Sequence, residues 1–155
     1  MSVEKRHLED FTVGEKATSP GRTVTETDIV MFAALSGDWS ELHTNADYMK
    51  DGPFGERIAH GLLTLSIAYG LTLRTRESSL IDVLALLGID KVRFMAPVLI
   101  GDTVKVEAEV IEARPSKSMP HAGILRFKNT VKNQRDEDVA SWETTVMVSR
   151  RLEEK

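Results

Sequence analysis

Two residues in the first third of the chain have the types and spacing of an acid–base pair: Asp38 and His43 lie five positions apart. A carboxylate and an imidazole can hold one water molecule between them and move its protons. The neighbouring Trp39 and Leu42 are apolar, so we expect them to withdraw the Asp38 carboxylate partly from solvent, which would raise its pKa and strengthen it as a base. Taken singly, such residues more often serve a turn or a structural hydrogen bond, so the pair needs a structural context.

A helix predicted just before this pair would place the acid at its C-terminal end. Thr25 is a suitable N-cap, Asp28 lies in the acidic first turn, and Gly37 is a common residue at the end of a helix. Residues 39–45 are then predicted to form a loop and residues 46–50 a short helical turn. The acid and the histidine would therefore lie on a connection between two elements.

A second helix is predicted over residues 61–73, which are apolar on almost every side. A helix of this kind is normally enclosed by the rest of the protein. Gly61 begins it, so its backbone N–H points out of the positive end of the helix dipole. Because glycine has no side chain, a carbonyl oxygen could approach this N–H closely.

In the rest of the chain, apolar and polar residues alternate, which is typical of strands with one buried face. Antiparallel strands with one solvated face, together with one enclosed helix, predict a single α+β domain over residues 1–155, with a curved sheet wrapped around a long central helix, the hotdog arrangement. Residues 1–11 are charged and are predicted to form a loosely ordered arm. The expected strands cover Val104–Val110, Leu125–Val131 and Ala140–Val148, with two earlier pieces, Leu84–Leu87 and Val92–Phe94, separated by a bulge at Gly88.

Composition excludes several classes of protein. The chain has no cysteine, which rules out disulfides, thiolate catalysis and cysteine-based zinc sites. The net charge of −4 argues against a nucleic-acid partner. No apolar run approaches the roughly 20 residues of a membrane span, and no signal peptide is evident, so we expect no membrane partner and a cytoplasmic location.

Three stretches in the same order resemble the MaoC-like dehydratases, which include the R-specific enoyl-CoA hydratases. They are residues 35–43 (LSGDWSELH), 54–63 (FGERIAHGLL) and 92–102 (VRFMAPVLIGD). The resemblance implies a hotdog fold and the reversible hydration or dehydration of an acyl thioester. It also implies that Asp38 and His43 are the catalytic pair, and that the backbone N–H of Gly61 contributes to the oxyanion site.

The chain departs from the family pattern beside the catalytic pair. The family commonly reads Asp-x-Asn-Pro-Leu-His, whereas Ser40 and Glu41 occupy the Asn and Pro positions here. The family's serine eight residues after the oxyanion glycine is replaced by Tyr69. Further residues that could line a substrate site are Trp39, Ser40, Phe54, His60 and Ser66, of which His60 is most simply interpreted as a structural residue at the helix start.

The resemblance also sets expectations about partners. The proposed chemistry needs no cofactor, and Asp38, His43 and His60 have the atom types of metal ligands without a recognised spacing, so no metal is expected. The substrate partner would be a thioester of CoA or of an acyl-carrier protein. A second copy of the chain is expected to cover the open sheet edge, giving a homodimer or a larger assembly of dimers.

Two other functions are compatible with the sequence. A hotdog thioesterase would also bind acyl thioesters, but that resemblance usually places its acid on the central helix, and residues 62–73 contain no Asp or Glu. A non-catalytic subunit could bind acyl chains or pair with an active partner. The acyl chain, the carrier and the physiological direction of the reaction do not follow from the sequence.

Overall fold

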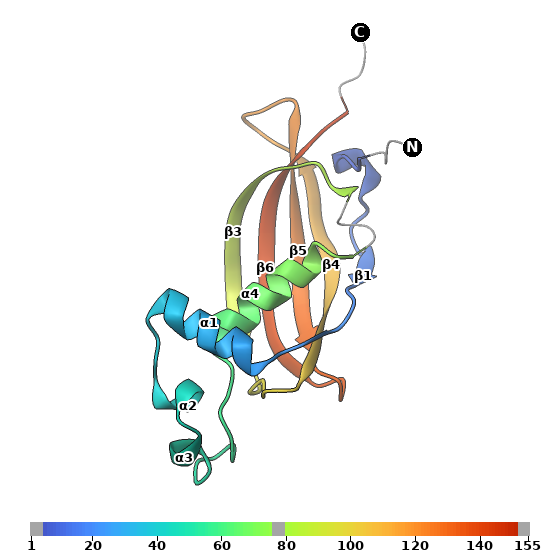
Figure 1. Ribbon diagram of the computed structural model, residues 1–155. Coiled ribbons are helices and arrows are strands. Elements are labelled where there is room, and N and C mark those ends of the chain that lie inside the picture. The colour runs from blue at the N-terminus through green and yellow to red at the C-terminus, as the bar shows by residue number, and fades with distance from the viewer. Residues whose placement is uncertain (1–4, 76–79, 152–155) are drawn as a thin grey trace.

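The computed structural model describes residues 5–75 and 80–151 and is built on one antiparallel sheet. The six strands run in the order β1-β4-β5-β6-β3, with β2 also paired to β4. Figure 1 shows the sheet curving around one helix, α4, that crosses its face. The strands are β1 (Lys16–Thr18), β2 (Arg22–Thr23), β3 (Val83–Phe94), β4 (Thr103–Pro115), β5 (Ala122–Lys132) and β6 (Asp138–Ser149).

The helical elements precede β3 in the chain. They are η1 (Leu8–Asp10), α1 (Glu26–Ser36), α2 (Glu41–Thr44), α3 (Ala46–Met49) and α4 (Gly61–Thr72). Ala68 and Leu71 of α4 are buried in one core cluster with Trp142 of β6, because the apolar face of the helix meets the inward-facing side chains of the sheet. The predicted α+β fold, with a curved sheet around a central helix, is confirmed.

The ends of α1 follow the predicted signals. Thr25 accepts a hydrogen bond from the backbone N–H of Asp28, and the Asp28 carboxylate accepts one from the backbone N–H of Thr25. This reciprocal capping box satisfies two N–H groups at the helix start. Gly37 ends the helix with a φ of 77°, a left-handed conformation that suits glycine. The acid that follows is therefore held at a defined helix end.

The connection from α1 to α4 contains more structure than predicted. The expected loop over residues 39–45 is interrupted by α2, whose single turn runs from Glu41 to Thr44. The short helical turn predicted after it is confirmed as α3, which is capped by the Asn45 side chain. The backbone N–H of Ile58 donates to the Leu42 carbonyl at 3.1 Å, which ties the end of the connection back to α2.

The two predicted strand pieces before residue 95 form one continuous edge strand, β3. The irregularity predicted at Gly88 is present as a register shift against β6 between Leu86 and Gly88, but it does not break the strand. Unlike the other long strands, β3 exposes apolar side chains on both faces: Leu86 and Leu87 are 47% and 49% exposed. An edge of this kind is open to pairing with another chain.

The start of the described chain differs from the loose arm predicted for residues 1–11. Leu8 and Phe11 are buried against the sheet, and the Arg6 guanidinium lies 4.0 Å from the centre of the Phe11 ring. Arg6 also forms an isolated parallel bridge with Ile81. Residues 5–11 are therefore packed, because two apolar side chains among the charges are enough to hold them; residues 1–4 lie outside the described residues.

The rest of the protein leaves one side of α4 uncovered, so the predicted enclosure of this helix is incomplete. Leu62 and Leu73 remain 63% and 50% exposed, whereas Ala68 on the sheet-facing side is fully buried. Within the described part of the chain, no helix is both long and apolar enough to cross a membrane. The exposed side of α4 is an apolar surface that a partner could cover.

Candidate active site

The connection after α1 brings Asp38 and His43 together. Asp38 follows the last residue of the α1 cap, and His43 lies in α2, so the Asp38 Oδ2 and His43 Nε2 atoms are 3.9 Å apart. The His43 side chain is 10% exposed and the Asp38 side chain 46% exposed. The distance is too long for a direct hydrogen bond, but a water could lie within hydrogen-bond distance of both atoms.

The tautomer of His43 follows from its other ring nitrogen. His43 Nδ1 lies 2.7 Å from the backbone carbonyl oxygen of Ile58. A carbonyl oxygen can only accept, so Nδ1 carries a hydrogen and donates it. In the neutral ring, Nε2 therefore presents its lone pair towards Asp38. The bond to Ile58 thus orients the ring for proton transfer at Nε2.

The electrostatics of Asp38 differ from the expectation. Hydrogen bonds from the Ser40 hydroxyl and from the Ser40 backbone N–H lower the pKa of the Asp38 carboxyl, and the nearby His43 acts in the same direction. The predicted rise is wrong, because Trp39 and Leu42 are 55% and 42% exposed and leave the carboxylate in solvent. Ser40 therefore stabilises the ionised form of Asp38.

His60 joins the connection to the start of α4. Its ring stacks on the His43 ring with centroids 3.8 Å apart, and its Nε2 lies 3.0 Å from the Asp38 backbone oxygen, to which it donates. The Phe32 ring of α1 also packs against the His60 ring, with the two ring centroids 5.0 Å apart. The side chain is buried, and its Nδ1 has no hydrogen-bond partner among the described residues. His60 therefore touches both members of the pair.

Gly61 is the first residue of α4, and its backbone N–H donates no hydrogen bond within the described part of the chain. The His60 side chain makes no capping hydrogen bond, and no described residue accepts from the Gly61 N–H. A Cβ added at Gly61 would lie 3.1 Å from two ring atoms of Phe94 in β3. Glycine thus allows the aromatic ring to pack directly on the helix start, where the dipole favours a negatively charged oxygen.

A family model described as the MaoC like domain matches residues 10–133, which cover α1, the connection that carries Asp38 and His43, α4 and most of the sheet. This chain belongs to the MaoC-like family. The chain is 35% identical over 148 residues to an (R)-specific enoyl-CoA hydratase of Rhodospirillum rubrum, covering 94% of this chain and 93% of that protein. It is 33% identical over 140 residues to Protein MaoC of Klebsiella aerogenes, covering 89% of this chain but only 36% of the longer protein.

Solved structures share the fold of this chain. A structure described as a monoamine oxidase regulatory protein from Archaeoglobus fulgidus has a TM-score of 0.86 and 38% identity, covering 98% of this chain and 99% of that one. A double hotdog protein from Mycobacterium tuberculosis has a TM-score of 0.79 at 20% identity, covering 97% of this chain and 46% of the other. The second match supports the fold alone.

Only some of the remaining predicted site residues of this MaoC-like chain lie against Asp38 and His43. Ser40 contacts Asp38 and His60 contacts both members of the pair, whereas Trp39 and Phe54 are exposed and make no recorded side-chain contact with them. Ser66 donates to the Leu62 carbonyl at 2.7 Å and lines an open groove between α1 and α4. The structure thus gathers two of these five residues around the acid and the histidine.

A metal would find suitable atoms but poor geometry in this cluster. Asp38, His43 and His60 each offer a ligating atom, and these atoms lie within 4.8 Å of one another. However, the two rings are stacked at an interplanar angle of 28°, so lone pairs that lie in the two nearly parallel planes do not readily converge on one ion. One nitrogen of each ring is also committed to a carbonyl. The arrangement suits proton transfer better than a tetrahedral ion.

Two contributors to the MaoC-like site carry no chemical signal in the sequence. The Ile58 carbonyl sets the His43 tautomer, and the Phe94 ring covers the backbone at Gly61. Every residue has a backbone carbonyl, so the residue type at position 58 does not reveal this role. Phe94 lies 33 positions after Gly61 in the chain, on a different element. His60, by contrast, is adjacent to Gly61 and was already among the residues that the sequence suggested could line the site, although it was interpreted there as structural.

Proposed function

We propose that this protein catalyses the reversible hydration of a 2-enoyl thioester to a 3-hydroxyacyl thioester. The observation that supports it best is the oriented pair: His43 Nε2 and Asp38 Oδ2 face one another across 3.9 Å with the imidazole held by Ile58. The named activity of the Rhodospirillum rubrum relative, which is matched over nearly its whole length, agrees with this chemistry.

In the hydration direction, the pair would bind one water molecule. Neutral His43 takes one proton from this water at Nε2, while the ionised Asp38 accepts a hydrogen bond from the O–H that stays on the water oxygen, and stabilises the imidazolium. The oxygen bonds to C3 as the double-bond electrons move towards the thioester oxygen. The imidazolium then returns its proton to C2, so the product contains all the atoms of one water. Dehydration is the reverse.

The thioester oxygen acquires negative charge during this reaction, and the N–H of Gly61 would stabilise it. This N–H has no acceptor among the described residues and lies at the positive end of α4. The His60–His43 stack places the start of α4 beside the pair. CoA and an acyl-carrier protein present the same thioester to this site, so either could be the carrier.

A homodimer is part of the proposal. Leu84, Leu86 and Leu87 on the β3 edge are each about half exposed, as is Phe94 beside Gly61, and Leu62 of α4 is 63% exposed. A second copy paired along β3 would cover this apolar edge and shield the start of α4 from water. Light scattering at micromolar concentration is expected to give twice the chain mass, and Leu86→Arg to lower it; a monomer in the unaltered protein would refute the dimer.

The activity is tested with crotonyl-CoA. The purified protein is expected to consume the enone absorbance and form the R-3-hydroxy product, and His43→Ala or Asp38→Asn to lower kcat by about 10³-fold. Matched controls are His121→Ala and Asp47→Asn, which change exposed residues of the same types outside the site. Release of free thiol would instead identify a thioesterase.

Absence of turnover across a panel of enoyl-CoA and enoyl-carrier-protein substrates would favour the non-catalytic acyl-binding function. The variants must retain the circular dichroism spectrum of the unaltered protein, because His43 is buried and its removal could disturb the connection.

A further inference from the structure

A second feature is an open groove of about 590 Å³ between α1 and α4. The two helices run in opposite directions along it, because Asp38 follows the end of α1, His60 precedes the start of α4, and these two residues are hydrogen-bonded. Both helices can be followed in Figure 1. One end of the groove therefore lies beside Asp38, and the other end lies where α1 begins and α4 ends.

The middle of the groove is apolar and open. Phe32 links it to the candidate active site, because this side chain lines the groove and its ring also packs against His60. Met31 and Leu35 of α1 line the same groove and remain 67% and 84% exposed. A Cβ built at Gly70 of α4 would meet no atom within 4 Å, so no close contact explains this destabilising residue inside the helix. An organic molecule would find an apolar surface here that nothing in the described chain covers.

Two guanidinium groups lie at the far end of the groove. Arg22 of β2 donates from Nη2 to Asp28 Oδ1 at 2.6 Å, whereas its Nη1 is buried and has no hydrogen-bond partner among the described residues. Arg74, just beyond the end of α4, is exposed, and its side chain has no hydrogen bond or ion pair within the described part of the chain. Both side chains therefore have unused donors.

The acid at this end neutralises only one of the two cations. Partial burial acts to raise the pKa of Asp28, but hydrogen bonds from Thr25 and from Arg22 outweigh it and lower the pKa below its ordinary value. The carboxylate is therefore ionised, and its oxygens are already occupied by these donors. Among the described residues that line the groove, one negative charge thus faces the two positive charges of Arg22 and Arg74, which favours an anion.

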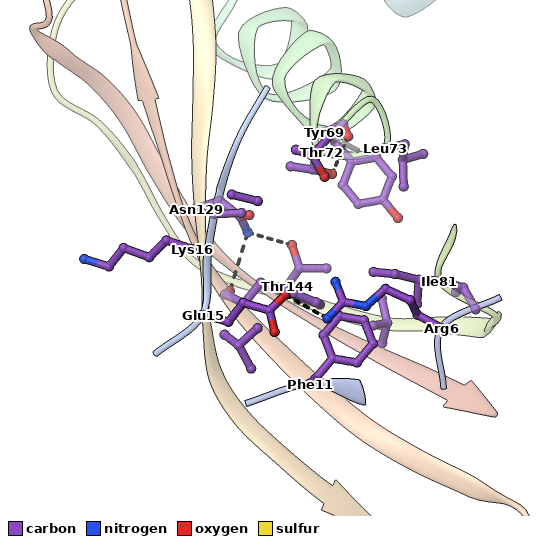
Figure 2. A pocket seen from close by; sticks show the side chains of 17 residues that line it. Arg6, Phe11, Glu15, Lys16, Tyr69, Thr72, Leu73, Ile81, Asn129 and Thr144 are labelled. Atoms are coloured by element: carbon purple, nitrogen blue, oxygen red, sulfur yellow. Dashed lines mark hydrogen bonds and ion pairs between the residues drawn. The ribbon is translucent and has the colours of Figure 1, made fainter. Parts of the chain in front are cut away.

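The cavity shown in Figure 2 has the opposite balance of charge. It is lined by a different set of α4 residues, and its Arg6 donates to Glu15 at 2.8 Å. The other cation at that cavity, Lys16, lies 3.6 Å from Glu109. Each of these cations has an acid of its own. Of the two hollows beside α4, the groove is therefore the one with a cation left to bind an anion.

We propose that this groove binds an organic phosphate, with the phosphate held by Arg74 and Arg22 and the organic part lying along the apolar middle. A guanidinium can form two parallel hydrogen bonds with a phosphate, and a phosphate group has three oxygens to share between two arginines, one more than a carboxylate. Arg74 lies 13 positions after Gly61, or about 20 Å along the helix at roughly 1.5 Å per residue. A molecule that fills the groove is therefore long rather than compact.

Two sources can supply such a phosphate. CoA and an acyl-carrier protein both attach a thioester through a phosphopantetheine arm, which would run from Gly61 towards the arginines; this source rests on the proposed function. A free nucleotide is the second source, and it would use the same arginines without any thioester. The groups that recognise the phosphate are the same in both cases, so binding defines the site and kinetics distinguish the sources.

Binding is measured by titration calorimetry with two matched pairs of probes, 4′-phosphopantetheine against pantetheine and 3′,5′-ADP against adenosine. In at least one pair, the unaltered protein is expected to bind the phosphorylated probe at least about tenfold more tightly. Arg74→Gln should reduce that preference about fivefold, and Arg74→Lys should keep most of it. The control is Arg114→Gln, which changes an exposed arginine outside the groove and should leave both affinities unaltered. Equal affinity within both pairs would overturn the proposal.

Steady-state kinetics identify the source. If the phosphate belongs to the substrate, Arg74→Gln should raise KM for crotonyl-CoA at least about fivefold more than KM for crotonyl-pantetheine, which lacks the phosphate, and 3′,5′-ADP should compete with crotonyl-CoA. If it belongs to a free nucleotide, 3′,5′-ADP should bind without competing, and Arg74→Gln should weaken the nucleotide alone. Arg74→Gln is the decisive variant because it breaks no described side-chain contact, whereas a change at Arg22 would leave Asp28 without its cation.

The two experiments also separate this site from the reaction. If no thioester is turned over but a phosphorylated probe binds through Arg74, hydration is refuted and the phosphate site stands. If crotonyl-CoA is hydrated but neither probe pair shows a preference for phosphate, hydration stands and the phosphate site is refuted.

Discussion

The two ends of α4 differ in almost every physical respect. At the N-terminal end, Asp38, His43 and His60 gather polar atoms within 4.8 Å of one another, and the acid is open to solvent. At the C-terminal end, a mostly apolar cavity contains the hydroxyl groups of Tyr69 and Thr144. The first end gathers an acid and two imidazoles that can move protons, whereas the second is lined mainly by apolar side chains.

With the proposed function, this difference would separate rate from specificity on one helix. Changes at the N-terminal end should alter kcat for every substrate, because the thioester and the water are common to all of them. Changes around the cavity should alter the ranking of substrates instead. The predictions that follow are ordered by size, and each would weaken this division if its effect fell on the wrong kinetic parameter.

After the loss of about 10³-fold expected for changes to Asp38 or His43 themselves, the next largest effect is expected from Gly61→Ala. The new Cβ would lie 3.1 Å from the Phe94 ring, so either the ring or the helix start must move, and the methyl group would also crowd an oxygen bound at the N–H. We expect kcat/KM to fall about 100-fold for crotonyl-CoA and for longer substrates alike, measured by loss of the enone absorbance.

A double variant separates the two causes. Phe94→Leu removes the ring that the new methyl group would meet, so Gly61→Ala combined with Phe94→Leu should regain activity if the ring clash dominates. No recovery would assign the loss to crowding of the substrate oxygen. A loss confined to long substrates would contradict the division between the two ends of α4.

His60 is expected to have the next largest effect. His60→Phe keeps a ring that can stack on His43 but removes the hydrogen bond to the Asp38 carbonyl, and His60→Gln keeps a donor but removes the ring. Loss of one such bond corresponds to about 1 kcal/mol, so kcat should fall about fivefold to tenfold with KM nearly unchanged. Equal kcat values for His60→Phe and the unaltered protein would show that the bond does not position Asp38.

Local signals explain which parts of this fold were predictable. The N-cap at Thr25, the stop at Gly37 and the helix start at Gly61 each depend on residues within four positions of one another, and all three are confirmed. The alternation of the later strands likewise depends on nearest neighbours and predicts which faces are buried. An open sheet edge was expected, but the sequence did not identify β3 as that edge, because alternation within a strand does not reveal which strands it pairs with.

The site was less predictable because its contacts are long-range. The bond from His60 to the Asp38 carbonyl joins residues 22 positions apart, and the stack of His60 on His43 depends on how the connection folds back. The predicted rise in the pKa of Asp38 relied on shielding by Trp39, but Trp39 is exposed. The hydrogen bond from the Ser40 hydroxyl instead lowers this pKa. Adjacency in sequence therefore suggested Asp38 and His43 as a pair but not their environment.

Ser40→Ala should have a smaller effect, visible mainly in the pH dependence. The hydroxyl bond from Ser40 lowers the pKa of Asp38, so the active carboxylate persists as the pH falls below the ordinary range of an aspartate. Without this bond the pKa rises, and the acidic limb of the kcat/KM profile should move to higher pH, with about twofold change or less at neutral pH. Ser40→Thr keeps the hydroxyl and should keep the profile. A shift towards lower pH in Ser40→Ala would contradict this assignment.

The smallest effect is expected from removing metal ions. The rings of His43 and His60 are stacked with an interplanar angle of 28°, and each already has one nitrogen bonded to a carbonyl, so they cannot readily direct two lone pairs at one ion. Dialysis against EDTA should leave turnover of crotonyl-CoA within about 20% of its starting value, with Zn²⁺ added back as the control. Loss of activity with EDTA and recovery with Zn²⁺ would mean that the N-terminal end of α4 binds an ion after the two rings separate. The stack would then describe a metal-free state, and the proton transfer assigned to His43 Nε2 would have to be replaced by activation of a metal-bound water.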